Sequence, residues 1–136
     1  MQVIVIDSSI ALQWVLPEEG RERAYRYVKA DGVISADVLM IEAGNVLAKK
    51  VRASEMSGSE AMDALTLIGR SVSRLVPTLP MIQRALDLSI DLSHPIYDCV
   101  FLACAEQEKG RLVTRDAPFA KRATERGYGH LLESAP

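Results

Sequence analysis

Residues 3–9, Val3-Ile4-Val5-Ile6-Asp7-Ser8-Ser9, decide the fold expected for this chain. The first four side chains are apolar and β-branched, a pattern typical of a parallel strand that is buried on both faces. Asp7 ends the run, and the two serines after it favour the start of a helix. A buried strand that passes straight into a helix predicts the first half of a β-α unit.

Short apolar runs and helical patterns alternate in the same way along all 136 residues. Strands are expected at residues 2–6, 33–35, 74–76 and 111–114, with Leu131 and Leu132 as a candidate edge strand. Helices are expected at residues 8–16, 18–29, 38–51 (with Asp37 as N-cap), 57–71 (from Ser57 or Ser59), 80–92, 96–108 and 117–126. The alternation predicts an α/β fold in three layers, α/β/α, around a mainly parallel central sheet. We expect one domain over residues 1–136.

The composition is that of a folded domain, with 49% hydrophobic residues. No stretch is apolar for the ~20 residues that a membrane span requires, and no basic-then-apolar segment stands at the start. We therefore expect a cytoplasmic protein without a membrane partner. Cys99 and Cys104 fall in one expected helix with four residues between them, a poor geometry for a disulfide, so we expect both to be reduced core residues.

The net charge of −2 does not exclude a nucleic-acid partner. Setting aside four acids that we consider as a site below leaves 14 acidic against 16 basic side chains. A divalent cation bound by those four acids would remove the repulsion that they exert on phosphate groups.

Two of the four acids follow expected strands. Asp7 ends the first apolar run, and Asp116 comes soon after the run Leu112-Val113-Thr114. Ligands of parallel α/β sheets bind at the carboxyl ends of the strands, which is where both acids are expected. Each has an ordinary alternative, since an aspartate before a helix can simply be its N-cap.

The third acid, Glu42, lies in the helix expected over residues 38–51. Its neighbours four and three residues before and four residues after it are Val38, Leu39 and Val46, so the pattern places the carboxylate on the buried stripe. A buried charge needs a partner. Asn45 on the same side could supply a hydrogen bond, which is the structural alternative to a ligand role.

The fourth acid, Asp98, occupies the first turn of a helix whose interior, residues 99–105, is entirely apolar. The helix dipole favours an acid at this place whatever its function. The coincidence of four acids at one sheet edge is more telling than any one of them. A site built from carboxylate oxygens suits Mg²⁺ or Mn²⁺ rather than zinc, so we predict that Asp7, Glu42, Asp98 and Asp116 share a cation.

Four stretches of the chain match the motifs of a known family. They are Val5-Ile6-Asp7-Ser8-Ser9, Glu42-Ala43-Gly44-Asn45-Val46-Leu47, His94-Pro95-Ile96-Tyr97-Asp98 running into Phe101-Leu102-Ala103, and Leu112-Val113-Thr114-Arg115-Asp116. With these stretches the chain resembles PIN-domain proteins, and more narrowly the VapC-type toxin ribonucleases of prokaryotic toxin-antitoxin pairs. Their order and spacing make the combination specific, and together they span nearly the whole chain.

The resemblance implies a PIN-like fold and a Mg²⁺- or Mn²⁺-dependent endoribonuclease that hydrolyses RNA phosphodiester bonds as a toxin. It implies a cognate antitoxin and a homodimer as partners. The residues to which it assigns the site are the acidic tetrad Asp7, Glu42, Asp98 and Asp116 and the supporting hydroxyls of Ser8 and Thr114. Some relatives carry a further acid after the last aspartate, where this chain has Ala117-Pro118-Phe119. The number of cations, one or two, stays open.

The antitoxin is expected across the early helices. The side chains expected to form an apolar groove for it are Ile10, Trp14, Val15 and Tyr25.

Other polar and aromatic residues have plainer interpretations. We expect His94, just before a proline that opens a helix, to be a cap or a packed side chain rather than a general base. Trp14 is expected to pack within its helix layer or to belong to a partner-binding surface, rather than to stack on bases. Basic side chains near the last acid can hold RNA phosphates or form the solvated face of the last helix: Arg115, Lys121, Arg122 and Arg126.

Two rival functions remain. Asp7 could be a phosphorylated nucleophile, as in haloacid-dehalogenase-like phosphatases or response-regulator receivers. Those phosphatases have a second aspartate where this chain has Ser9, and receivers have a lysine after a late strand, where this chain has Thr114-Arg115. The non-enzyme rival is a PIN-fold module that binds RNA or a partner with an idle site, and the complete set of four acids argues against it.

Overall fold

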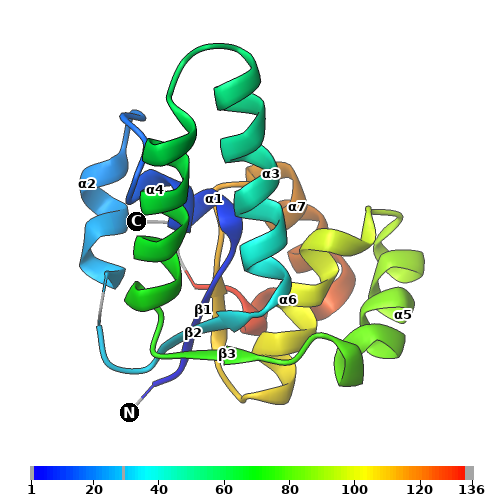
Figure 1. Ribbon diagram of the computed structural model, residues 1–136. Coiled ribbons are helices and arrows are strands. Elements are labelled where there is room, and N and C mark those ends of the chain that lie inside the picture. The colour runs from blue at the N-terminus through cyan, green and yellow to red at the C-terminus, as the bar shows by residue number, and fades with distance from the viewer. Residues whose placement is uncertain (1, 29, 134–136) are drawn as a thin grey trace.

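The computed structural model describes residues 2–28 and 30–133, and its centre is a four-stranded sheet. All neighbouring strands are parallel, in the order β3-β2-β1-β4 (Figure 1). The strands are β1 (Ile4–Ile6), β2 (Val33–Ala36), β3 (Arg74–Val76) and β4 (Arg111–Val113). The expected parallel α/β fold is confirmed.

Helices connect the strands. The α-helices are α1 (Ser8–Gln13), α2 (Arg21–Ala24), α3 (Val38–Arg52), α4 (Gly58–Ser71), α5 (Ile82–Leu92), α6 (Ile96–Gln107) and α7 (Ala117–Ala123). Three short 3-10 helices are η1 (Tyr25–Tyr27), η2 (Leu79–Met81) and η4 (Gly129–Leu131), and η3 (Thr124–Tyr128) is a π-helical turn.

The strand order separates the helices into two layers. The chain steps from β1 to β2 to β3 in one direction and then returns past β1 to β4. Because such crossovers are right-handed, α1 to α4 lie on one face of the sheet and α5 and α6 on the other. Accordingly α3 contacts α1 and α4, whereas α6 contacts α5 and the strands β1, β2 and β4 (Figure 1). The direction reverses between β1 and β4, and sheets of this kind bind ligands in the crevice beyond the carboxyl ends of the strands at that point.

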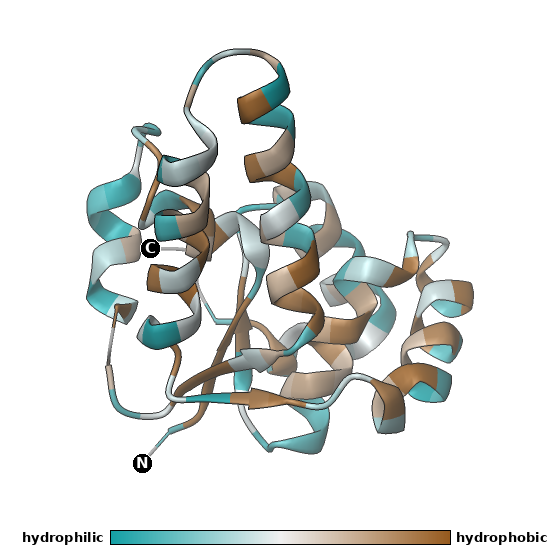
Figure 2. Cartoon of the chain, in the orientation of Figure 1, coloured by the Kyte–Doolittle hydropathy of each residue, from teal (hydrophilic) through white to brown (hydrophobic). Residues whose placement is uncertain are grey.

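Helix α6 forms the centre of the core. Residues 99–105 are all buried, as their apolar sequence predicts, and Phe101 is among the largest fully buried side chains. Figure 2 shows most of β1 and the middle of this helix in the brown of hydrophobic residues. Cys99 and Cys104 are buried and free, which confirms the expected thiols. Burial raises the pKa of the Cys99 thiol to about 11, and that of the Cys104 thiol to about 12.

The two helices expected near the start are shorter than predicted. The helix expected over residues 8–16 ends at Gln13. The one expected over residues 18–29 begins only at Arg21 and changes to the narrower turn η1 at Tyr25. Gly20 has a left-handed backbone (φ 82°) that no α-helix contains, so the chain cannot be helical before Arg21. Lys29 lies outside the described residues.

Two further details differ from the sequence prediction. Asp37 does not cap α3 with its side chain; its carboxylate instead accepts hydrogen bonds from the backbone N–H and the hydroxyl of Thr78. The Thr78 hydroxyl in turn accepts the Val38 N–H at the start of α3. Near the other end, Leu132 makes only an isolated parallel bridge to Leu112, because η4 occupies the preceding residues.

The predicted N-cap of α4 is confirmed. Ser57 caps α4 through a capping box with Glu60: the Ser57 hydroxyl accepts the Glu60 N–H and the Glu60 carboxylate accepts the Ser57 N–H.

Within the part of the chain that the structure describes, no helix combines the length and the apolar character that crossing a bilayer requires.

Candidate metal centre

The carboxyl ends of β1 and β4 place Asp7 and Asp116 at the same edge of the sheet. The two strands pair directly, with Ile6 opposite Val113. Each acid also caps the helix that follows it: Asp7 Oδ1 accepts the Ile10 N–H at 3.2 Å, and Asp116 Oδ1 accepts the Phe119 N–H at 3.0 Å. Both cap interpretations are therefore correct, and they do not exclude a role as ligands.

Asp7 is the most buried acid of the site, with 4% of its surface exposed. Burial raises the pKa of its carboxyl group to about 6, and the negative charge of Asp98 adds to this rise. Hydrogen bonds from Ser9, Thr114 and the Ile10 backbone oppose the rise but do not cancel it. A nearby positive charge would strongly stabilise the ionised form of this buried carboxylate.

Two hydroxyl groups join the ends of β1 and β4. The Ser9 hydroxyl donates to Asp7 Oδ1 at 2.6 Å, and the Ser9 Oγ in turn accepts the Arg115 N–H at 3.1 Å. Thr114, buried, hydrogen-bonds to Asp7, and its hydroxyl accepts the Asp116 N–H at 3.1 Å. These contacts tie Asp7 to the segment that carries Asp116.

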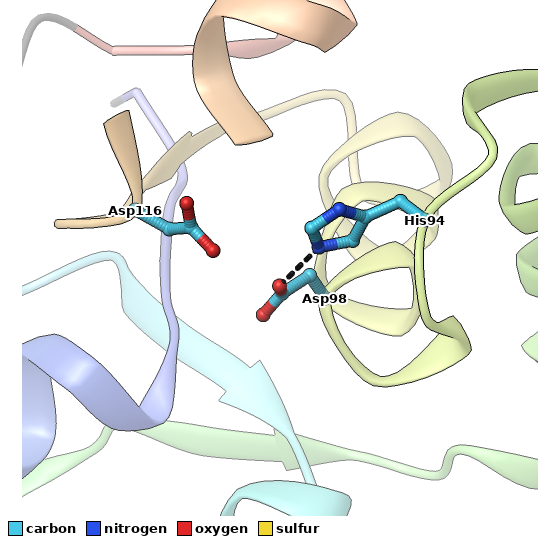
Figure 3. Close-up of side chains that lie close together, drawn as sticks. All are labelled: His94, Asp98 and Asp116. Atoms are coloured by element: carbon cyan, nitrogen blue, oxygen red, sulfur yellow. Dashed lines mark hydrogen bonds and ion pairs between the residues drawn. The ribbon is translucent and has the colours of Figure 1, made fainter. Parts of the chain in front are cut away.

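Asp98 lies in the first turn of α6, as predicted, and faces Asp116 and His94 (Figure 3). Potential ligand atoms of His94, Asp98 and Asp116 all lie within 4.8 Å of one another. His94 Nε2 and Asp98 Oδ2 are 2.6 Å apart. The His94 ring also packs on Phe119, with ring centroids 4.5 Å apart. The packing expectation for His94 is confirmed, but the residue also belongs to the acidic cluster.

Glu42 reaches the site from α3 and is half-buried. Its Oε1 accepts the Ser8 hydroxyl at 3.2 Å. Burial raises the pKa of the Glu42 carboxyl group, and the charges of Asp98 and Asp7 raise it further. The negative charge of Asp98 thus raises the pKa of both Asp7 and Glu42. Neither of these two acids belongs to the group formed by His94, Asp98 and Asp116.

The surroundings of Glu42 differ from the sequence prediction. The buried stripe of α3 consists of Leu39, Ala43 and Leu47, so Glu42 stands beside it rather than on it. Asn45 is exposed and lines a surface pocket together with Ser8, Glu42 and Tyr97. The partner that holds Glu42 is therefore the Ser8 hydroxyl, and not the Asn45 amide that the sequence suggested.

The residues present fit a divalent cation. The donor set consists of carboxylate oxygens and one imidazole nitrogen within the reach of a single ion. Arg115, the residue before Asp116, does not neutralise these carboxylates, because its guanidinium pairs with Glu18 at 2.9 Å. Further along, Arg126 pairs with Asp91, and Arg122 donates to the Leu92 carbonyl. Lys121 is exposed.

The sequence did not predict that His94 and Ser9 belong to the site. His94 precedes Asp98 by four residues, a spacing that brings side chains together on a helix face. Because Pro95 lies between them and the helix was expected to begin after it, the two residues were not expected to share such a face. Ser9 follows Asp7 by two residues, a spacing at which a serine hydroxyl can reach the acid.

Two of the four side chains expected in the apolar groove, Ile10 and Trp14, are buried and cannot line it. The Trp14 indole N–H donates to the Ala24 carbonyl. Val15 is partly buried, and Tyr25 is exposed.

Comparisons with known proteins agree with this architecture. The PIN domain family model matches residues 4–125. The crystal structure of PAE2754 from Pyrobaculum aerophilum superposes with a TM-score of 0.72 at 19% sequence identity, covering 89% of this chain and 84% of that one. No curated protein sequence matches the chain. Since the family model covers most of its length, the chain belongs to the PIN domain family and has its nuclease-type fold.

Proposed function

We propose that this PIN domain is a Mg²⁺- or Mn²⁺-dependent endoribonuclease. The observation that carries the proposal is the convergence of Asp98, Asp116 and the buried Asp7 at the crevice between β1 and β4, with Glu42 coupled to them from α3. PIN domains are generally metal-dependent nucleases, and the donors present suit a hard divalent cation.

Asp98 and Asp116 would hold the cation, with Asp7 behind them. When bound, such a cation lowers the pKa of an attacking water and offsets the charge that develops on the phosphate. Glu42 is half-buried, is held by the Ser8 hydroxyl and has a raised pKa, so it is suited to orient that water and accept its proton. Attack by water on phosphorus, with the ribose 3′-oxygen leaving, gives a 5′-phosphate and a 3′-hydroxyl.

A phosphorylated Asp7 fits the site poorly. Its carboxylate is 4% exposed and its Oδ1 already accepts hydrogen bonds from Ser9 and Ile10, so a phosphoryl donor has little access to it. A covalent acyl-phosphate trapped on Asp7 would reverse this assignment.

The test is cleavage of structured cellular RNA with Mg²⁺, with Mn²⁺ and with chelator. The wild type and Asp63→Asn, a change in an exposed acid of α4, are expected to cleave only with a divalent cation, whereas Asp98→Asn and Asp116→Asn are expected to be inactive. Equal cleavage by all four proteins, or cleavage in chelator, would contradict the proposal. Tight RNA binding without cleavage would favour the idle binding module instead.

The proposal includes the role of toxin in a toxin-antitoxin pair. Expression of the wild type is then expected to arrest growth, and Asp98→Asn at equal folded yield is expected to relieve it. A short adjacent reading frame for a small DNA-binding protein is the genetic observation that would support this role.

The antitoxin would bind the groove between α3 and α4 rather than the early helices. This groove is apolar, and the small residues Gly44, Ala48 and Ala61 leave room in it for side chains of an inserted amphipathic helix. Co-expression with the protein of the adjacent frame tests this: Ala48→Arg is expected to abolish co-purification. Retention by Ala48→Arg would contradict the assignment.

The homodimer remains part of the proposal. Helix α5 and the turn before it present an exposed apolar stripe of Leu79, Ile82, Leu86 and Ile90, with residues three or four apart on one side. A second copy that packs its own stripe against this one would cover it, since a two-fold interface uses the same patch on both subunits. Light scattering is expected to give a dimeric mass for the wild type and a monomeric one for Leu86→Glu. A monomeric wild type would contradict it.

A further inference from the structure

His94 brings the only nitrogen donor into the group of ligand atoms described above, within the part of the chain that the structure covers. Across an ion with bonds of about 2.1 Å, opposite ligands stand about 4.2 Å apart. The atoms of His94, Asp98 and Asp116 all lie within 4.8 Å of one another, a span that small side-chain rotations close. Figure 3 shows the Asp116 carboxylate pointing toward the pair formed by His94 and Asp98.

The place of the His94 ring is determined by contacts outside the cluster. Ser93, before it, has a left-handed backbone (φ 50°) that ends α5, and the Ser89 hydroxyl donates to the His94 carbonyl. Arg122 donates to the Leu92 carbonyl from α7. These contacts fix the backbone from which the imidazole extends toward the site.

The ring face is also occupied. Phe119 is fully buried and packs against the imidazole at 4.5 Å, while its own backbone N–H is held by Asp116. Only the edge that carries Nε2 meets the acids, at 2.6 Å from Asp98 Oδ2. When a cation takes the place of the proton between Nε2 and Asp98 Oδ2, the tautomer with its proton on Nδ1 offers the Nε2 lone pair to that cation.

We infer that His94 Nε2 is a direct ligand of the cation site and makes the site select Mn²⁺ over Mg²⁺. Mg²⁺ prefers a shell of oxygen donors, whereas first-row transition cations accept imidazole readily. An all-carboxylate site would not discriminate in this way. The inference rests on the proposed cation site, and it adds a residue and a preference that the four acids alone do not supply.

Mn²⁺ itself is the probe that tests this. Pulsed electron paramagnetic resonance of Mn²⁺ bound to the wild type is expected to show modulation by an imidazole ¹⁴N nucleus. His94→Gln is expected to lose it, and His130→Gln, the same change at the exposed second histidine, is expected to keep it. The ratio of Mn²⁺ to Mg²⁺ affinity is expected to fall about tenfold in His94→Gln alone.

Three results would overturn the inference while leaving the cation site in place: Mn²⁺ bound to the wild type without ¹⁴N modulation, modulation that persists in His94→Gln, or an unchanged ratio of Mn²⁺ to Mg²⁺ affinity. The first would assign His94 to holding Asp98 by a hydrogen bond only. Failure of the wild type to bind either cation would overturn this inference and the proposed function together. Mn²⁺ bound with ¹⁴N modulation but without RNA cleavage would leave the ligand role standing and remove the nuclease. Thermal unfolding of each variant verifies that it is folded.

Discussion

The Ser9 hydroxyl donates a 2.6 Å hydrogen bond to Asp7, the buried acid that follows β1. The same oxygen accepts the Arg115 N–H from the segment that follows β4. One small side chain thus holds a desolvated carboxylate in place and joins the two strand ends that form the crevice. Burial still prevails over this bond, because the pKa of Asp7 stays at about 6.

Asp7→Asn is therefore expected to stabilise the cation-free protein. The pKa of Asp7 is higher in the folded state (about 6) than the ordinary value of 3.8, so its contribution to stability is fully present below pH 3.8 and is lost as pH rises through 6. The variant should exceed the wild type in free energy of unfolding by about 2–3 kcal/mol at pH 8. The gap should shrink as pH falls below 6.

Urea unfolding with chelator at several pH values between 5 and 8 measures this gap. Asp63→Asn, in an exposed position, serves as the control and should follow the wild type throughout. An Asp7→Asn variant that is less stable than the wild type at pH 8 would show that the lost hydrogen bonds outweigh the desolvated charge.

Glu42→Gln is expected to lower the cleavage rate by about 10²-fold or more, since an amide cannot accept the proton of an attacking water. Asn45→Ala, three residues further along the same helix and exposed, should change the rate by less than about threefold. Single-turnover RNA cleavage compares the two. Equal losses would mean that the surface pocket, rather than the Glu42 carboxylate, matters for the rate.

Gly110→Ala is expected to destabilise the fold by about 1–3 kcal/mol. A Cβ atom at Gly110 would stand 2.5 Å from the Val3 carbonyl oxygen, so β1 and β4 would have to move apart at their amino ends, the ends away from the site. Gly58→Ala is the matched control: it begins α4, its Cβ would meet nothing within 4 Å, and its stability should be unchanged or slightly higher. Thermal unfolding of both variants measures these changes in stability, and equal stability of the two variants would contradict the prediction.

The strands and long helices could be predicted from sequence because their burial is encoded locally. The apolar run before Asp7 and the continuous apolar stretch 99–105 allow few alternatives. Residues 99–105 are buried as expected, and in the first run Val5 and Ile6 are buried while Val3 and Ile4 are partly buried. The segment around Gly20 could not be predicted so well, because a single left-handed residue shortens the helix without altering its hydrophobic pattern.

The site was predictable at its acids and less so at their partners. Asp7 and Asp116 follow strands whose carboxyl ends meet, a relation that parallel topology supplies. The partners of Glu42 and Asp98 depend on side chains far away in the chain or beyond a proline: Ser8 lies 34 residues before Glu42, and His94 approaches Asp98 only because Ser93 turns the backbone.

Calorimetric titration with Mn²⁺ tests the central claim, that the acids beyond β1 and β4 share a divalent cation, most directly. The account predicts saturable binding by the wild type and by Asp63→Asn. It predicts at least about tenfold weaker binding by Asp7→Asn, Asp98→Asn and Asp116→Asn, each still folded. Binding by these three variants with the affinity of the wild type would contradict it.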